Sequence, residues 1–83
     1  MKGVVHYINQ QRGMVAVFTE QDYSIFEIIS GDNVEVGDSV SWRDDTALGG
    51  EMLTNHTQGE RYEVYFQNHY IHQSQLGQQL LIR

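Results

Sequence analysis

A β-hairpin near the N-terminus constrains the fold more than any other stretch of this sequence. Residues 3–18 contain two runs of β-favouring residues that flank a polar turn, residues 9–12, and Gly13 closes this turn. Valine, isoleucine, tyrosine and phenylalanine suit a pleated strand, and glycine adopts the positive φ that such turns often need. The sequence therefore predicts two antiparallel strands joined by a short turn.

Four further segments are interpreted as strands, and two of them, residues 39–42 and 60–72, show the alternation of apolar and polar residues that is typical of strands. They are separated by polar or glycine-containing stretches and cover residues 23–29, 39–42, 52–55 and 60–72. In the second of these segments, Val40 and Trp42 are expected on the buried face, and the glycine pair at 49–50 is interpreted as a turn. Several short strands punctuated by turns favour an all-β barrel or a small sandwich.

Length and composition indicate one small domain. The chain has 83 residues and no cysteine, so neither a disulfide nor a thiolate metal site can stabilise it. Its stability has to come from apolar burial, or in part from a subunit interface. No run approaches the roughly 18 apolar residues of a membrane span, and the N-terminus lacks the apolar segment of a secretory signal. The sequence predicts a cytoplasmic protein with no membrane partner.

The charge balance opposes strong binding to nucleic-acid phosphates. Eleven acidic residues face five basic ones, which leaves a formal net charge of −6. Phosphate binding needs a basic patch, because its affinity comes from the counterions that lysine and arginine release. The basic residues are instead spread along the chain, at Lys2, Arg12, Arg43, Arg61 and Arg83. A local basic patch is compatible with this composition, but the overall field works against it.

Four stretches carry motifs in a recognisable order. They are Gly-Val-Val-His-Tyr-Ile-Asn at 3–9, Arg-Gly-Met-Val-Ala-Val at 12–17, an acidic-glycine turn with a strand at 34–42, and Gly-Gly-Glu-Met-Leu-Thr-Asn at 49–55. Together they resemble the cold-shock domain, a five-stranded OB-type barrel that binds single-stranded nucleic acid. The resemblance covers residues 1–57. It implies that these residues form the barrel and that residues 58–83 are a C-terminal extension packed on the same domain.

The same resemblance implies a reduced platform for nucleic-acid bases. Cold-shock domains stack bases on outward aromatic side chains, and each stack contributes about 1–3 kcal/mol. Here the two aromatic positions of the second strand hold Met14 and Ala16, and an acid, Glu27, follows the aromatic of the third strand. The residues that remain for such a platform are Tyr7, Arg12, Met14, Phe18 and Phe26. The competing interpretation is ordinary sheet surface, or contacts to the C-terminal extension.

The C-terminal extension combines a predicted strand with a short helix, and its apolar residues need a place to pack. Ser74 is expected to cap one or two helical turns that carry Leu76, Leu80 and Leu81. The extension either covers the platform or forms a subunit interface, since an exposed strand edge can pair with a second chain. The first arrangement would close the nucleic-acid site.

Two non-enzymatic functions follow from these observations. In the first, the domain is a small binding module with weak affinity for single-stranded RNA or DNA. In the second, nucleic-acid binding is lost, and the domain is a protein-interaction or homo-oligomerisation module that uses residues 60–83. Tyr7, Asn9 and the Arg12–Gly13 turn favour the first function. The acidic charge and the missing aromatics favour the second.

Two residue groups resemble chemical sites but lack the partners that such sites need. Potential zinc ligands are His56, His69 and His72. No cysteine or carboxylate at motif spacing completes a tetrahedral set around them. The carboxylates of Asp44, Asp45 and Glu51 lie near the glycine pair, but no nucleophile accompanies them. The sequence therefore predicts no metal, no cofactor and no catalytic residue.

Overall fold

The predicted hairpin forms the first two strands of the fold. The computed structural model of the chain describes residues 1–29, 33–43 and 48–80. In it, β1 (Lys2–Asn9) and β2 (Met14–Phe18) pair antiparallel. Gly13 ends the connecting turn with a φ of +67°, a conformation that glycine adopts without a steric penalty. Its carbonyl accepts a hydrogen bond from the Ile28 N–H at 2.8 Å, so the turn is also tied to the next strand.

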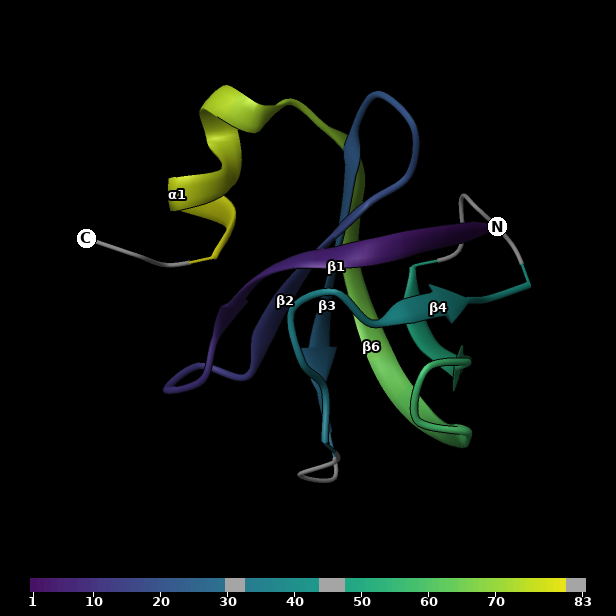
Figure 1. The fold of residues 1–83 in the computed structure, drawn as a ribbon. Coiled ribbons are helices and arrows are strands. Elements are labelled where there is room, and N and C mark those ends of the chain that lie inside the picture. The colour runs from purple at the N-terminus through teal and green to yellow at the C-terminus, as the bar shows by residue number, and fades with distance from the viewer. Residues whose placement is uncertain (30–32, 44–47, 81–83) are drawn as a thin grey trace.

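The described residues after the hairpin form four more strands and one short helical segment (Figure 1). These elements are β3 (Tyr23–Ile28), β4 (Ser39–Ser41), β5 (Gly49–Asn55), β6 (Glu60–Ile71), the 3₁₀ turn η1 (Gln73–Gln75) and α1 (Leu76–Gln79). Every segment that was predicted as a strand contains one. The glycine pair at 49–50 belongs to β5 and is not a turn, because Gly50 pairs with Tyr65 on β6 and Gly49 pairs with the neighbouring Phe66.

The strands close into an antiparallel barrel in the order β1-β2-β3-β6-β5-β4, with β4 paired back onto β1. This confirms the predicted all-β class and fits a small OB-like barrel. The place of β6 differs from our expectation that residues 1–57 would complete the barrel, because β6 lies between β3 and β5. Its alternate residues Tyr62, Val64 and Phe66 face the interior. Without β6, the edges of β3 and β5 would be left unpaired.

The barrel interior holds the main hydrophobic core. Phe26 and Phe66 are fully or almost fully buried, with ring centroids 5.6 Å apart, and the Trp42 ring lies 4.9 Å from Phe66. The predicted burial of Val40 and Trp42 is confirmed. The other core members are Val5, Val15, Val17, Val34, Leu53, Tyr62 and Val64. Most come from alternate strand positions, as expected when one face of each strand points inward.

A buried carboxylate links the start of β4 to the end of β5. Asp38 accepts hydrogen bonds from the Asn55 side chain at 2.8 Å, the Gln58 side chain at 2.9 Å and the Glu35 backbone N–H at 2.9 Å. Burial by itself raises the pKa of the Asp38 carboxyl, but the three hydrogen bonds outweigh burial and hold this pKa below its ordinary value. Asn55, which belongs to one of the cold-shock-like motifs, therefore has a structural role here.

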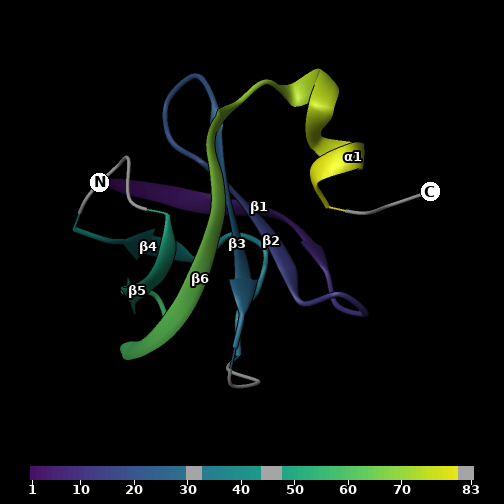
Figure 2. The same ribbon diagram turned by 180° about the vertical axis from the view of Figure 1, so that it is seen from behind.

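A second apolar cluster lies outside the barrel, where the C-terminal segment packs on β2 and β3 (Figure 2). Leu76 and Leu80 pack with Met14, Ala16 and Ile25. The segment therefore lies against the outer face of its own barrel, which is one of the two arrangements that the sequence left open. We refer to η1, α1 and Leu80 as the C-terminal segment.

Side chains hold both ends of the C-terminal segment. His72 takes the capping position that was predicted for Ser74, and its side chain accepts a hydrogen bond from the Ser74 backbone N–H at 3.1 Å. At the other end, the Asn9 side-chain amide donates to the Leu80 carbonyl at 2.6 Å. The predicted contact of Leu81 lies outside the described residues. The segment is thus fastened to β1 as well as packed on β2 and β3.

Candidate binding surfaces on the outer face of the barrel

The structure places the five predicted nucleic-acid-binding residues in different environments. Phe26 points into the barrel and is fully buried, because it pairs with the inward-facing Val15. Met14 faces outward but is only 7% exposed, because the C-terminal segment covers it. Exposed or half-buried on the outside are Tyr7, Arg12 and Phe18. The five side chains therefore do not form one open platform.

A β-bulge in β1 creates an aromatic group that sequence reasoning missed. Val5 pairs with Val17 and Tyr7 pairs with Ala16, which leaves His6 as an extra residue on β1. Because a bulge breaks the alternation of strand faces, His6 and Tyr7 are both exposed on the outer face. Two rings from β2 and β3 adjoin them. We call this group the aromatic patch: His6, Tyr7, Phe18 and Tyr23.

The four rings of the aromatic patch contact one another. His6 stacks on Phe18 with a centroid distance of 5.1 Å and an interplanar angle of 10°, and its Nδ1 lies 3.0 Å from the Tyr23 hydroxyl oxygen. The Tyr7 and Tyr23 centroids are 6.1 Å apart. Burial raises the pKa of the Tyr23 phenol, and the adjacent Tyr7 phenol raises it further. Tyr7 remains 43% exposed, so the cluster presents the Tyr7 ring to solvent beside the exposed His6.

A shallow hollow of about 340 Å³ adjoins the aromatic patch, and we call it the Phe18 hollow. Its lining residues are Lys2, Gly3, Val4, Phe18, Thr19, Glu20 and Ser39. The close approach of β1 and β2 here requires glycine at position 3. A Cβ on Gly3 would lie 2.6 Å from Val17 Cγ1 and would collide with the Phe18 carbonyl oxygen. The shape of the hollow therefore depends on that glycine.

The turn beside the Phe18 hollow is strained. Glu20 has a φ of +110°, a backbone region that costs a non-glycine residue roughly 1–3 kcal/mol. The Thr19 backbone N–H and hydroxyl both donate to the Asp22 carbonyl, at 3.0 and 3.1 Å, and hold the turn in shape. Such strain is concentrated at functional sites in proteins. It is a second feature, independent of the rings, that directs attention to this end of the outer face.

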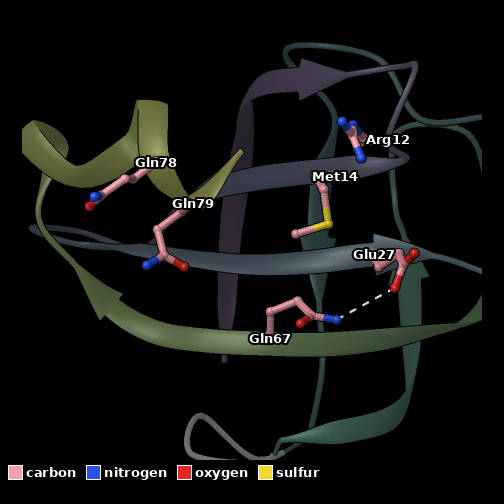
Figure 3. Close-up of a pocket in the computed structure, with 6 residues that line it drawn as sticks. All are labelled: Arg12, Met14, Glu27, Gln67, Gln78 and Gln79. Carbon is pink, nitrogen blue, oxygen red and sulfur yellow. Dashed lines mark hydrogen bonds between the residues drawn. The ribbon is translucent and has the colours of Figure 1, made fainter. Parts of the chain in front are cut away.

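A larger hollow of about 450 Å³ lies on the same outer face beside the C-terminal segment. We call it the glutamine hollow, and its lining residues are Arg12, Met14, Glu27, Gln67, Gln78 and Gln79. Figure 3 shows Met14 in the middle, with Arg12 and Glu27 toward one end and the glutamines of α1 toward the other. The Gln67 amide lies 3.5 Å from Glu27 Oε1, which is a long hydrogen bond. The predicted residues Arg12 and Met14 therefore lie together, at a site that α1 completes.

The outer face is closed between the aromatic patch and the glutamine hollow. Ala16 pairs with Ile25 in the middle of the β2–β3 ladder, and both are fully buried. Leu76 and Leu80 of the C-terminal segment belong to the same apolar cluster and cover them. Leu76 and Leu80 therefore separate the aromatic patch from the glutamine hollow. The platform implied by the cold-shock resemblance is therefore interrupted in this state.

The candidate zinc ligands have hydrogen-bond partners within the fold. His69 is buried, and its Nδ1 lies 2.8 Å from the Ser24 hydroxyl oxygen, while His56 Nε2 lies 2.7 Å from the Ser41 hydroxyl oxygen. The third histidine caps η1. Over residues 1–29, 33–43 and 48–80, no group of three or more histidine, cysteine or acidic residues is placed to hold a metal ion. Outside these ranges lie the candidate carboxylates Asp44 and Asp45.

Sequence reasoning missed these surfaces for identifiable reasons. The bulge shifts His6 onto the face of Tyr7, and strict alternation would have placed these neighbours on opposite faces. The only available signal was a pair of adjacent aromatic rings in an otherwise alternating strand. The glutamine hollow combines side chains from the β1–β2 turn, three strands and α1. Its glutamines resemble ordinary polar surface in the sequence.

No family model, curated protein or solved structure matches this chain. No helix in the described part of the chain is long and apolar enough to cross a membrane. The resemblance of residues 1–57 to a cold-shock domain therefore stays a prediction.

Proposed function

We propose that the protein is a non-enzymatic binding module that engages a protein partner through the aromatic patch. The observation that supports this most strongly is the bulge in β1, which presents two consecutive rings, His6 and Tyr7, on the outer face. An exposed Tyr7 contributes little to the barrel core, yet it is held against Tyr23 in an ordered cluster. Ordered tyrosines of this kind are enriched among the residues that dominate binding energy at protein interfaces.

The Phe18 hollow gives the aromatic patch a place to accept a partner side chain. Interface residues that contribute most to affinity insert into well-packed pockets and exclude water from their surroundings. The hollow lies directly beside Phe18, and Val4, which lines it, is 40% exposed. An apolar side chain inserted there would contact Phe18 and Val4 while the partner backbone lies over Tyr7. The partner we expect therefore carries an apolar anchor residue.

The negative charge of the chain indicates which kind of protein partner it would bind. The net charge of −6 makes a second copy of this chain repulsive at long range and favours association with a positively charged partner. Locally, Glu20 and Lys2 both line the Phe18 hollow and Asp22 follows Glu20 in the same turn, so one negative charge is in excess there. We expect the apolar anchor of the partner to be flanked by lysine or arginine. This chemistry favours a hetero-interaction over the homo-oligomer that the sequence also suggested.

Single-stranded nucleic acid is less well supported at the aromatic patch. One of its predicted stacking residues, Phe26, is buried in the core, and the C-terminal segment covers the middle of the outer face. The net charge of −6 also opposes phosphate binding. An oligonucleotide is therefore expected to bind the patch more weakly than a basic protein segment does.

The test is a selection of displayed random peptides on the full chain, with counter-selection on Tyr7→Ala. The expected peptides share an apolar residue flanked by basic residues, and Tyr7→Ala weakens their binding about tenfold or more by fluorescence polarisation. Tyr65→Ala is the matched control, because Tyr65 is 47% exposed and lies on β6 outside the patch. Peptides that bind both variants equally would contradict the proposal.

Two parallel measurements distinguish the alternatives. Labelled oligo-dT and oligo-U are titrated at two salt concentrations, and tight, salt-sensitive binding that Tyr7→Ala removes would assign the patch to nucleic acid instead. Analytical ultracentrifugation reports self-association, and a dimer that Tyr7→Ala dissociates would assign the patch to a second copy. A monomer without affinity for oligo-dT or oligo-U is the expected result.

A further inference from the structure

The glutamine hollow contains polar side chains that make few hydrogen bonds within the fold. No hydrogen bond or ion pair engages the Arg12 guanidinium within the described residues, and Glu27 has only the long contact from Gln67. The carboxamides of Gln67, Gln78 and Gln79 line the same hollow and can each donate and accept, and Figure 3 shows that Gln78 points away from Arg12 and Glu27. We propose that the glutamine hollow binds a purine base, with guanine preferred over adenine. This site is separate from the aromatic patch and goes beyond the protein-binding function proposed for it.

The dimensions and the floor of the glutamine hollow suit a flat ring. A space of about 450 Å³ is within the usual range of small-molecule sites. Met14 lies in the middle of the lining, with polar side chains around it (Figure 3). A thioether makes favourable contacts with aromatic rings. Because Met14 is only 7% exposed, the face of a base can contact its side chain only in part, while the edges of the base reach the surrounding polar groups.

The two charged residues distinguish between the purines. Guanine presents the N1–H and N2–H₂ donors side by side and the acceptors O6 and N7 next to them. The Glu27 carboxylate can accept from the two donors, and the Arg12 guanidinium can donate to the two acceptors. Adenine presents an acceptor, N1, where guanine has a donor, so its lone pair would face the Glu27 carboxylate. Adenine therefore loses an interaction and meets a repulsive one.

The charges also determine how binding depends on salt. Arg12 and Glu27 cancel formally within the glutamine hollow, and the whole chain is negative. Phosphate groups therefore contribute little, and affinity resides in the base. Gln78 and Gln79 come from α1, beyond the residues 1–57 that resemble a cold-shock domain. The site thus depends on the C-terminal segment of this chain and not on an aromatic stacking platform.

The first experiment titrates guanosine and adenosine into the uniformly ¹⁵N-labelled full chain and follows it by NMR. Guanosine is expected to shift the side-chain amide signals of Gln67 and Gln79 and the Nε–H signal of Arg12, with at least tenfold tighter binding than adenosine. The shifts should change little between about 50 mM and about 200 mM salt, because guanosine carries no phosphate. Equal binding of the two nucleosides, or no shift at saturating guanosine, would overturn the proposal.

A matched pair of variants tests the role of Glu27. Glu27→Gln keeps the shape but replaces one acceptor by a donor, and it should weaken guanosine about tenfold or more. Glu63 is also exposed, but it lies on β6 and does not line the hollow. Glu63→Gln removes the same charge and should therefore leave guanosine binding unchanged. An equal loss in both variants would attribute the effect to net charge and overturn the site. Thermal melting of each variant verifies that the fold is intact.

A second series of ligands distinguishes a base within a nucleic-acid strand from a free nucleoside or nucleotide. A guanine-containing single-stranded oligonucleotide that binds more tightly than guanosine would indicate a base presented by a strand, whereas equal affinity would indicate a free nucleoside or nucleotide. An oligonucleotide that binds when guanosine does not would overturn the glutamine hollow as a base site. Tyr7→Ala should leave guanosine binding unchanged, so failure here and failure of the aromatic patch are separate outcomes.

Discussion

The aromatic patch and the glutamine hollow share one outer face of the barrel, but they are built in different ways. The patch consists of residues from β1, β2 and β3, and a local bulge in β1 creates it. The glutamine hollow requires α1, which is held by Leu76, Leu80 and the hydrogen bond from Asn9. One surface therefore lies on strands of the closed barrel, although its Tyr23 and Phe18 also pack in the apolar cluster that contains Leu76 and Leu80. The other depends on the docking of a short terminal segment.

This difference matters because short terminal elements open more easily than strands in a closed sheet. α1 spans only Leu76–Gln79 and cannot be stable without tertiary contacts. When it detaches, Met14, Ala16 and Ile25 become exposed, and the glutamine hollow loses its wall. In the patch, Tyr23 and Phe18 also lose contacts with that cluster, but the patch keeps its three strands. Substitutions can therefore affect one surface and leave the other in place.

The largest expected effect comes from Leu80→Ala. Leu80 is 1% exposed, so the substitution should lower the free energy of unfolding by about 2–4 kcal/mol. Because the lost contacts hold the C-terminal segment, amide hydrogen exchange in residues 73–80 should rise much more than in β1 and β2. Chemical denaturation and exchange measured by NMR test this. Uniformly faster exchange over the whole barrel would contradict the separation of the two surfaces.

A smaller effect, at the aromatic patch, is expected from Gly3→Ala. The new Cβ would meet Val17 and the Phe18 backbone, so we expect destabilisation of about 1–3 kcal/mol together with a distorted aromatic patch. The NMR signals of His6 and Tyr7 should shift, while those of the glutamine hollow stay in place. Gly50→Ala is a suitable control, because its new Cβ would find only ordinary contacts, the nearest at 3.7 Å to Glu63.

Low pH should destabilise the barrel because Asp38 becomes protonated. This loss of stability should affect the aromatic patch, which lies on the barrel strands β1, β2 and β3. The folded pKa of Asp38 lies below the ordinary value of about 3.9. The stabilisation is therefore present above the unfolded pKa and is lost as pH falls through the folded pKa. Thermal melting between about pH 6 and pH 2 should show this loss. Asp38→Asn should flatten the dependence, and an equally steep profile in that variant would contradict the assignment.

The smallest expected effect is a gain from Gly77→Ala. A Cβ at position 77 meets nothing within 4 Å, and alanine is favoured over glycine inside a helix by about 1 kcal/mol. The variant should melt slightly higher and should protect residues 73–80 from hydrogen exchange. If guanosine binds the glutamine hollow, its affinity should rise a little, because less ordering is needed. A loss of protection would show that α1 is not helical in solution.

Much of the barrel could be predicted because strand signals are local. The hairpin around Gly13, the burial of Val40 and Trp42, and the strand containing Tyr62 follow from alternation and turn chemistry. The position of that last strand between β3 and β5 did not follow, since alternation identifies a strand but not its neighbours. The candidate site was predicted less well. Phe26 points inward because of a register that one residue of slippage would reverse.

By itself, the sequence determined the all-β class, the hairpin and the negative charge that disfavours phosphate ligands, because composition, turn residues and periodicity act over short distances. Only the tertiary structure decided what the outer face presents. A bulge in β1 brought His6 beside Tyr7, and the docking of α1 buried Ala16 and added two glutamines to Arg12 and Met14. These outcomes depend on register and on packing between distant segments. No local pattern encodes either of them.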